Sequence, residues 1–416
     1  MRSWLGWSMF TAHYETLSEG QKVHIESIIK MIEKRAGAEI SEHPPHGTPH
    51  LTPLRISLDP LNVENRPAIV YAVVNLAGFG ALRWYEWRHG VQYGTIGGLD
   101  YLIRIPSGPL DMPRGDEDRT PILFLHGVGV GLVQHLVFIN NILSDTTLAN
   151  RIVLIPIQPH ISQTIFHPNH IHPPRKDEIL RDLRLLIYMA CSIAGFENRP
   201  QVTVLSHSNG TSLHAWLLKS NPELIFRSCF VDPVIFCLWE GGILFLGVLT
   251  YLAQSKTDVI YMSLDVCYNF VYKAPSNGVE ALSKYFVASE MGIANYIQRN
   301  WDWSANTLFF QEIPHPHDAY RTRIFLSGRD QIVSAKRVRR YFAFHGLTDV
   351  DSKTVFVHEG ATHAEAMFLG GAGLRFIVNW LKATGIGSLS GMEDFQDEKV
   401  GRSTYPVRLD DERQYS

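Results

Sequence analysis

The stretch VTVLSHSNGTSLHAWLL, residues 202–218, decides the fold that this sequence predicts. Its first half is rich in β-branched and apolar residues, as in a buried strand, and its second half has the apolar spacing of a helix. Ser208 stands at the junction, between Ser206 two positions before it and Gly210 two positions after it. A strand that turns sharply into a helix requires small residues at these positions. The pattern predicts a nucleophile elbow at Ser208, although a serine that only caps a helix would produce a similar pattern.

The composition is that of a globular protein and argues against several other classes. The 416 residues are 45% hydrophobic, which is enough for a large core with insertions. A net charge of −3 and a pI near 6.7 provide no basic surface, so nucleic acid is not expected as a partner. The four cysteines form no CxxC pair and are expected to be buried free thiols. The N-terminus lacks a signal-peptide pattern, which favours a cytoplasmic or peripherally membrane-associated protein over a secreted one.

The order of apolar runs and turn residues predicts an α/β fold, with a mostly parallel sheet flanked by helices. From Gly94 onward short apolar strands alternate with helical patterns, and a long apolar and aromatic segment, residues 233–320, interrupts the alternation. Such an insertion indicates a mainly helical cap, because its apolar surface must be buried against something. The expected organisation is an N-terminal helical extension (1–93), a core (94–232 and 321–385), a helical cap or lid (233–320) and a polar, disordered tail (386–416).

The individual elements follow from the same patterns. Strands are expected at residues 98–106, 121–125, 151–156, 201–205, 227–231, 323–326 and 354–357. Helices are expected at residues 18–36, 132–143, 176–194, 335–345 and 363–384, and from Ser208 to about residue 219. The segment HPPHGTPH, residues 43–50, has a histidine density that could bind a metal, but its prolines favour a solvated loop.

Two apolar stretches raise the question of a membrane. Residues 68–82, AIVYAVVNLAGFGAL, number 15, which is fewer than the roughly 20 needed to span a bilayer. The second stretch, residues 231–253, is long enough to span a bilayer but includes Asp232 and Glu240. A charge at bilayer depth costs about 2.5–3.5 kcal/mol. Both stretches are therefore expected to form buried helices or helices that lie in the membrane interface, which makes a peripheral membrane contact one expectation.

An activated serine needs a site that stabilises the oxyanion, and the sequence offers one. The strand at residues 121–125 ends in His126-Gly127-Val128-Gly129, where glycines allow the backbone to turn and present N–H groups. The backbone N–H groups of Val128 and Asn209 would together form the oxyanion hole. The run does not have the GxGxxG spacing of a dinucleotide-binding loop.

The serine also needs a base and an acid, and each has a preferred candidate and an alternative. Asp330, in IFLSGRDQIVS, follows one strand and precedes a helix, and Asp232, in CFVDPV, is the alternative acid. His363, in VFVHEGATHAEAM, lies in the loop after the last strand and is preferred to His358, which ends that strand. His207 is adjacent to Ser208 and is expected to point away from the site.

The chain order Ser208, Asp330, His363 distinguishes one triad fold from the others. With these motifs the sequence resembles the α/β-hydrolase superfamily over residues 94–384 apart from the insertion, and in particular its large-capped members found in fungi. Many members have glycine two positions before the nucleophile, where this chain has Ser206. The resemblance implies an acyl-enzyme mechanism with His363 as base and Asp330 as its orienting acid.

The function expected from these residues is hydrolysis of a carboxylic ester, as in a carboxylesterase or lipase. The expected partner is a small-molecule ester or acyl substrate, and the mechanism requires no metal and no organic cofactor. Three alternatives stay open. The same residues would serve an acyltransferase or a carbon–carbon bond hydrolase, and the fold also occurs in non-catalytic binding proteins.

Overall fold

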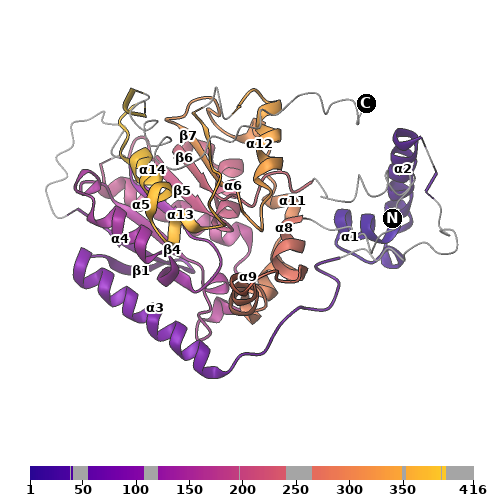
Figure 1. The fold of residues 1–416 in the computed structure, drawn as a ribbon, viewed down its shortest axis with the longest axis horizontal. Helices are drawn as coiled ribbons and strands as arrows, with labels where there is room; N and C mark the ends of the chain where they lie inside the picture. Colours follow the sequence, from indigo (N-terminus) through magenta and orange to yellow (C-terminus); the bar gives the residue numbers. More distant parts are fainter. Residues whose placement is uncertain are drawn as a thin grey trace.

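The computed structural model describes most of the chain (Figure 1). The described residues are 1–37, 39–40, 55–106, 120–195, 197–239, 265–348, 353–385 and 387–389. The histidine-rich segment 43–50, residues 240–264 of the predicted cap and the tail from residue 390 lie outside them. The predictions that fall on those segments therefore stay predictions.

One mixed sheet of eight strands organises the fold. Its order is β1-β2-β4-β3-β5-β6-β7-β8, and only β2 runs opposite to its neighbours. This is the α/β-hydrolase fold, as the sequence predicted. The strands are β1 (Gln92–Ile96), β2 (Leu99–Arg104), β3 (Ile122–Leu125), β4 (Val153–Ile157), β5 (Val202–His207), β6 (Ile225–Val231), β7 (Thr322–Ser327) and β8 (Val355–His358).

Helices cover both faces of the sheet, as Figure 1 shows. Alternate residues of a strand point to opposite faces, and β3 is buried on both: Leu123 and Leu125 pack in one core, Ile122 and Phe124 in the other. The first core includes α5 (Lys176–Ile193), α6 (Gly210–Ser220) and α12 (Ala335–Phe344), and the second includes α4 (Leu136–Ser144) and α14 (Gly371–Lys382). Shorter helical segments are η3 (Gly131–His135), η4 (Thr146–Leu148), η5 (Pro159–Ile161), η6 (Pro168–His170), η7 (Pro222–Leu224) and α13 (Glu365–Phe368).

The N-terminal extension is helical, as expected. It comprises α1 (Arg2–Phe10), η1 (Tyr14–Thr16), α2 (Glu19–Ala36) and α3 (Ala68–His89). Ser18 and Gln21 form a capping box that starts α2, and Gly37 in the left-handed conformation ends it. The α-helices of this extension lie in two separate regions. α1 and α2 lie beyond the cap helices, whereas α3 runs along the α/β core (Figure 1).

The described part of the predicted cap, from residue 265 onward, is a series of short helices. They are α8 (Asp265–Cys267), η8 (Tyr268–Tyr272), α9 (Gly278–Ser283), η9 (Lys284–Ala288), α10 (Met291–Asn295), η10 (Tyr296–Asn300), α11 (Trp303–Asn306) and η11 (Phe310–Glu312). The side-chain amide of Gln298 accepts from the Asn62 backbone N–H and donates to the Asn62 carbonyl, so the chain before α3 is tied to these helices.

Three features differ from the sequence-based prediction. β1 had not been predicted, because its short run QYGTI lies at the antiparallel edge with little apolar content. The helix predicted at residues 363–384 is divided into α13 and α14 at Gly370 and Gly371, both of which have positive φ. Of the two arrangements expected for the apolar stretch at 68–82, the buried helix is not found: the stretch is part of the longer helix α3, in which only Ala81 and Tyr85 are buried.

Candidate active site

Ser208 lies in the sharp turn between β5 and α6. Its φ is +50°, a left-handed conformation that is strained for a residue with a side chain. The Ser208 backbone N–H donates to the Val231 carbonyl at 3.0 Å, and the Ser208 carbonyl accepts from the backbone N–H and the hydroxyl of Thr211. The turn thus has the sharp strand-to-helix geometry that the sequence predicts for an elbow, and hydrogen bonds to β6 and α6 hold it on both sides.

The close approach of strands and helix at the elbow explains the small residues around it. A Cβ on Gly210 would come within 2.2 Å of the Leu125 carbonyl oxygen, and a Cβ on Gly127 would come within 2.9 Å of the Ser208 Cβ. Ser206 has a further role that its size did not reveal. Its hydroxyl lies 2.8 Å from Nδ1 of the buried His214, so a glycine at this position would leave that nitrogen unpaired.

His363 lies between Ser208 and Asp330. Its Nε2 is 2.9 Å from the Ser208 Oγ, and its Nδ1 is 2.6 Å from Oδ2 of Asp330. Both distances are within hydrogen-bonding range. Asp330 follows Ser208 by 330 − 208 = 122 positions, and His363 lies further along the chain. The fold therefore brings together side chains that are far apart in the sequence.

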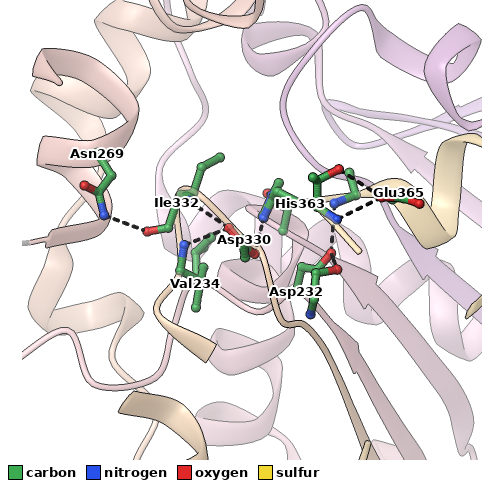
Figure 2. A network of polar contacts seen from close by, with 12 residues as sticks. Asp232, Val234, Asn269, Asp330, Ile332, His363 and Glu365 are labelled. Carbon is green, nitrogen blue, oxygen red and sulfur yellow. Dashed lines mark hydrogen bonds and ion pairs between the residues drawn. The ribbon is translucent and has the colours of Figure 1, made fainter. Parts of the chain in front are cut away.

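The Asp330 carboxylate is fixed by the turn that carries it (Figure 2). Its Oδ1 accepts from the backbone N–H groups of Ile332 and Val333, at 2.7 and 2.9 Å, which leaves Oδ2 for His363. Asn269, in η8, donates to the Ile332 carbonyl at 3.3 Å. A described part of the predicted cap is thereby linked directly to the loop of the candidate acid.

Asp232, the alternative acid, faces a different set of donors. Its buried carboxylate accepts from the backbone N–H and the hydroxyl of Ser327 at 2.8 and 3.0 Å, and from the Ala364 backbone N–H at 2.8 Å. Ala364 follows His363 and has a φ of +68°. Asp232 thus holds the strained loop of the histidine rather than the imidazole itself. Glu365 secures the other side of that loop by accepting from Thr362 (Figure 2).

The charges around the imidazole determine its pKa. Burial disfavours the imidazolium, but the negative charge and hydrogen bond of Asp330, together with the charge of Asp232, outweigh this effect and raise the pKa of His363 to about 9. Burial is also the main reason that the pKa of Asp232 rises to about 6. One side-chain oxygen or nitrogen from each of Asp232, Asp330 and His363 lies within 4.8 Å of the other two, so both carboxylates are close enough to act on the imidazole.

The side-chain amide of Gln134 stabilises the turn that carries Val128 by hydrogen bonds. The Gln134 amide accepts from the Val130 N–H at 2.9 Å and donates to the Val128 carbonyl at 3.0 Å. Within the described residues, the backbone N–H groups of Val128 and Asn209 have no hydrogen-bond acceptor. Both residues line the same cavity as Ser208, as an oxyanion hole would require.

A mostly apolar cavity of about 360 Å³ opens at Ser208. Its walls come from the core and from the cap helices together. The lining residues are Val128, Ser208, Asn209, Val234, Val266, Cys267, Phe270, Ile297, Trp301 and Ile332. Trp301 belongs to the apolar and aromatic segment 233–320 that predicts the cap, but nothing in the sequence distinguishes the apolar wall residues from ordinary core residues.

His207 lies close to the site, contrary to the expectation that it would point away. Its ring centroid is 5.8 Å from that of His363 and 5.2 Å from that of the buried His135. Burial lowers the pKa of His207 well below its ordinary value, and the neighbouring His135 lowers it further. His207 is therefore a neutral, buried neighbour of His363. The geometric cause is the alternation of β5, which directs His207 to the sheet face opposite to that of Ser206.

Several solved structures are similar to this chain, at low sequence identity. No protein-family model and no curated protein sequence matches the chain. Similar solved structures include a carboxylesterase from Bacillus subtilis (11% identity, 75% of this chain and 98% of that chain, TM-score 0.42). They also include a putative lipase from Acinetobacter baumannii AYE (14% identity, 80% of this chain and 99% of that chain, TM-score 0.42). A third is a 2-hydroxy-6-oxo-6-phenylhexa-2,4-dienoate hydrolase from Rhodococcus sp. strain RHA1 (14% identity, 70% of this chain and 100% of that chain, TM-score 0.40).

The different contacts of the two aspartates predict different effects of their amides. Asp330→Asn removes the charge that orients and stabilises the imidazolium, and loss of this group in a triad costs about 10⁴ in kcat. Asp232→Asn leaves Asp330 on the imidazole and changes only the loop after His363 and one nearby charge, so its cost should be about 10²-fold or less, as for a small displacement of a catalytic group. Steady-state hydrolysis of p-nitrophenyl acetate by both variants, with circular dichroism as a check on folding, tests the ranking. A larger loss in Asp232→Asn would assign the acid to Asp232.

The pKa of His363 predicts the pH dependence of activity. A general base must be neutral, and because the carboxylates raise the pKa of His363, activity should fall with decreasing pH along a limb displaced to the alkaline side of 6.5. Asp232→Asn removes one of the charges that favour the imidazolium, so it should move this limb to lower pH. The exposed Asp177→Asn serves as control and should leave it in place. An unmoved limb in the Asp232 variant would contradict the assigned cause.

Proposed function

We propose that this protein is a serine hydrolase that cleaves carboxylic esters with an apolar acyl group. Ser208 is the nucleophile, His363 the general base and Asp330 the acid that orients it, and the Val128 and Asn209 N–H groups bind the oxyanion. The α/β-hydrolase fold alone does not support this proposal, because the fold carries many functions. The site must support it.

The observation that carries the proposal is the continuous hydrogen-bonded series from Ser208 through His363 to Asp330. The donor and acceptor distances of 2.9 and 2.6 Å suit proton transfer from the serine hydroxyl to Nε2. The strained elbow adds a second argument, since strain of this kind is kept where it serves function. A serine that only capped α6 would need neither the histidine nor the buried carboxylate.

The first half of the reaction follows from these positions. As the Ser208 Oγ attacks the carbonyl carbon of the ester, its proton moves to His363 Nε2 and the carbonyl oxygen becomes an oxyanion. The N-terminus of α6 and the two backbone N–H groups favour this negative charge. The imidazolium, stabilised by Asp330, then gives its proton to the leaving alcohol, which departs and leaves an acyl-enzyme.

The second half repeats the same proton transfers with water as the nucleophile. His363 takes a proton from water, the resulting oxygen attacks the acyl carbon, and the oxyanion forms again beside Val128 and Asn209. The imidazolium returns its proton to Ser208 as the acid product leaves. An alcohol or amine in place of water would give acyl transfer through the same residues, and analysis of products with and without an acceptor distinguishes the two reactions.

The cavity at Ser208 supports an apolar acyl group as the part of the substrate held by the enzyme. Its walls beside the serine are formed by Val234, Ile297, Trp301 and Ile332, without a charged side chain among the lining residues. A carboxylate or an ammonium group would lose its hydration there without gaining a partner. An acyl chain instead contributes free energy for each methylene that leaves water.

The proposal predicts that Ser208→Ala abolishes ester hydrolysis, with a loss of about 10³-fold or more because the nucleophile is absent. Covalent labelling by a fluorophosphonate probe, which reports an activated serine directly, should vanish as well. The exposed Ser220, at the end of the same helix, provides the matched control: Ser220→Ala should retain both labelling and hydrolysis. Full hydrolysis by a folded Ser208→Ala protein would end the proposal.

The apolar cavity predicts a dependence on acyl chain length. Each added methylene that is buried contributes up to about 0.8 kcal/mol, so kcat/KM for p-nitrophenyl esters should rise by up to about fourfold per carbon over several carbons. Val266→Phe fills part of the cavity and should shift the optimum to shorter chains. Val279→Phe makes the same change at an exposed position of α9 and should not. A flat or falling preference from two carbons upward would exclude an apolar acyl pocket.

A further inference from the structure

The outward face of α3 is an apolar stripe. Val73, Leu76, Phe79 and Trp87 follow Ile69 by 4, 7, 10 and 18 positions, so they lie on or beside one line along the helix. Each of the five is between 58% and 80% exposed. We call these five residues the α3 stripe. At 1.5 Å per residue it extends over roughly 27 Å. An ordinary protein surface has apolar residues scattered singly, whereas these five form a continuous row.

The inner face of α3 is fixed to the protein along its length. Tyr85 is fully buried in the core. The Tyr71 hydroxyl donates to Glu290 at 3.0 Å, and the Asn75 amide donates to the Gln163 carbonyl at 3.1 Å. Figure 1 shows the whole helix lying against the α/β core at one edge of the molecule. The stripe is therefore exposed because the opposite face is already occupied.

These contacts also determine how α3 could meet a membrane. Among the described residues it is the one helix whose length and composition would allow it to cross a bilayer. A crossing orientation would expose Tyr85 and the polar groups of Tyr71 and Asn75 to lipid and break the contacts that they make with the rest of the protein. A helix that lies flat keeps those contacts and buries only the stripe.

The charges of α3 are gathered at one end. Residues 68–82 contain no charged side chain, and Arg83, Arg88 and His89 follow them. Arg83 is paired with Glu86 at 2.8 Å but keeps a side chain that is 58% exposed, and Arg88 is exposed. Next to these cations stands Trp87, a residue type that favours the membrane–water interface. Cations and an indole beside an apolar stripe complement a lipid surface with anionic headgroups.

We propose that the α3 stripe binds the surface of a lipid bilayer, with α3 lying in the plane of the interface and its C-terminal arginines among the headgroups. A second copy of this chain fits the stripe less well. In an antiparallel pair, Arg83 and Arg88 of one helix would lie on the apolar Ile69 end of the other, and in a parallel pair the arginines would lie together. In a membrane, both arginines extend to the headgroups while the stripe is buried.

Sedimentation with vesicles tests this proposal on the full chain. The probes are vesicles of phosphatidylcholine alone and of phosphatidylcholine and phosphatidylserine in equal amounts. Leu76→Glu should reduce binding at least tenfold, because it places a charge where the exposed Leu76 side chain would enter the bilayer. Phe344→Glu, which makes a similar change at an exposed residue of α12, is the matched control and should bind like the unmodified protein. Arg88→Ala should weaken binding to the phosphatidylserine vesicles about fivefold.

The inference does not depend on the proposed function, and the measurements keep the two apart. Ser208→Ala should bind vesicles as well as the unmodified protein, and Leu76→Glu should hydrolyse a water-soluble ester at the unmodified rate. Absence of vesicle binding by the unmodified protein would overturn the inference, as would binding that Leu76→Glu leaves intact. A dimer, detected by light scattering and dissociated by Leu76→Glu, would assign the α3 stripe to a second copy instead.

Discussion

The close contact between β3, β5 and the start of α6 is the constraint on which the site depends. Because no Cβ fits between Gly210 and the Leu125 carbonyl, α6 begins directly against the end of β3. In that turn Ser208 has the left-handed conformation, at a cost of about 1–3 kcal/mol that the surrounding contacts must offset. The same contact brings the Asn209 N–H and the Val128 turn to one side of the serine. Strain at one residue thus sets the positions of the others.

The three histidines near Ser208 differ in pKa because their surroundings differ. His363 has two carboxylates beside it, which raise its pKa, whereas His207 and His135 are buried without a carboxylate, and burial lowers the pKa of both. A proton taken from the serine is therefore favoured on His363 alone. Asp232 contributes to this charge while its hydrogen bonds hold the backbone at Ala364. One carboxylate holds the imidazole, and the other holds the loop that presents it.

The local patterns of the sequence were sufficient where neighbouring residues carry the signal. The elbow, the strand order along the chain and the helix caps depend on residues within one or two turns of each other, and the predicted strands correspond to β2 through β8. The sequence also singled out Ser208, Asp330 and His363, which the structure brings within hydrogen-bonding distance. It had no means of finding the bond between Ser206 and His214, because a small polar residue at an elbow is accounted for by its size alone.

What the sequence by itself determined is the α/β-hydrolase fold and a short set of candidate residues, because alternation, spacing and turn residues act over short distances along the chain. Only the tertiary structure shows which of the two aspartates contacts the imidazole of His363. β6 and β7 are neighbours in the sheet, and their pairing brings Asp232 against Ser327 while the loop after β7 carries Asp330 to the imidazole. Only the tertiary structure decided, too, which face of α3 is covered. An apolar helix has the same sequence whether it is buried or exposed, and the difference depends on the contacts that the rest of the fold offers it.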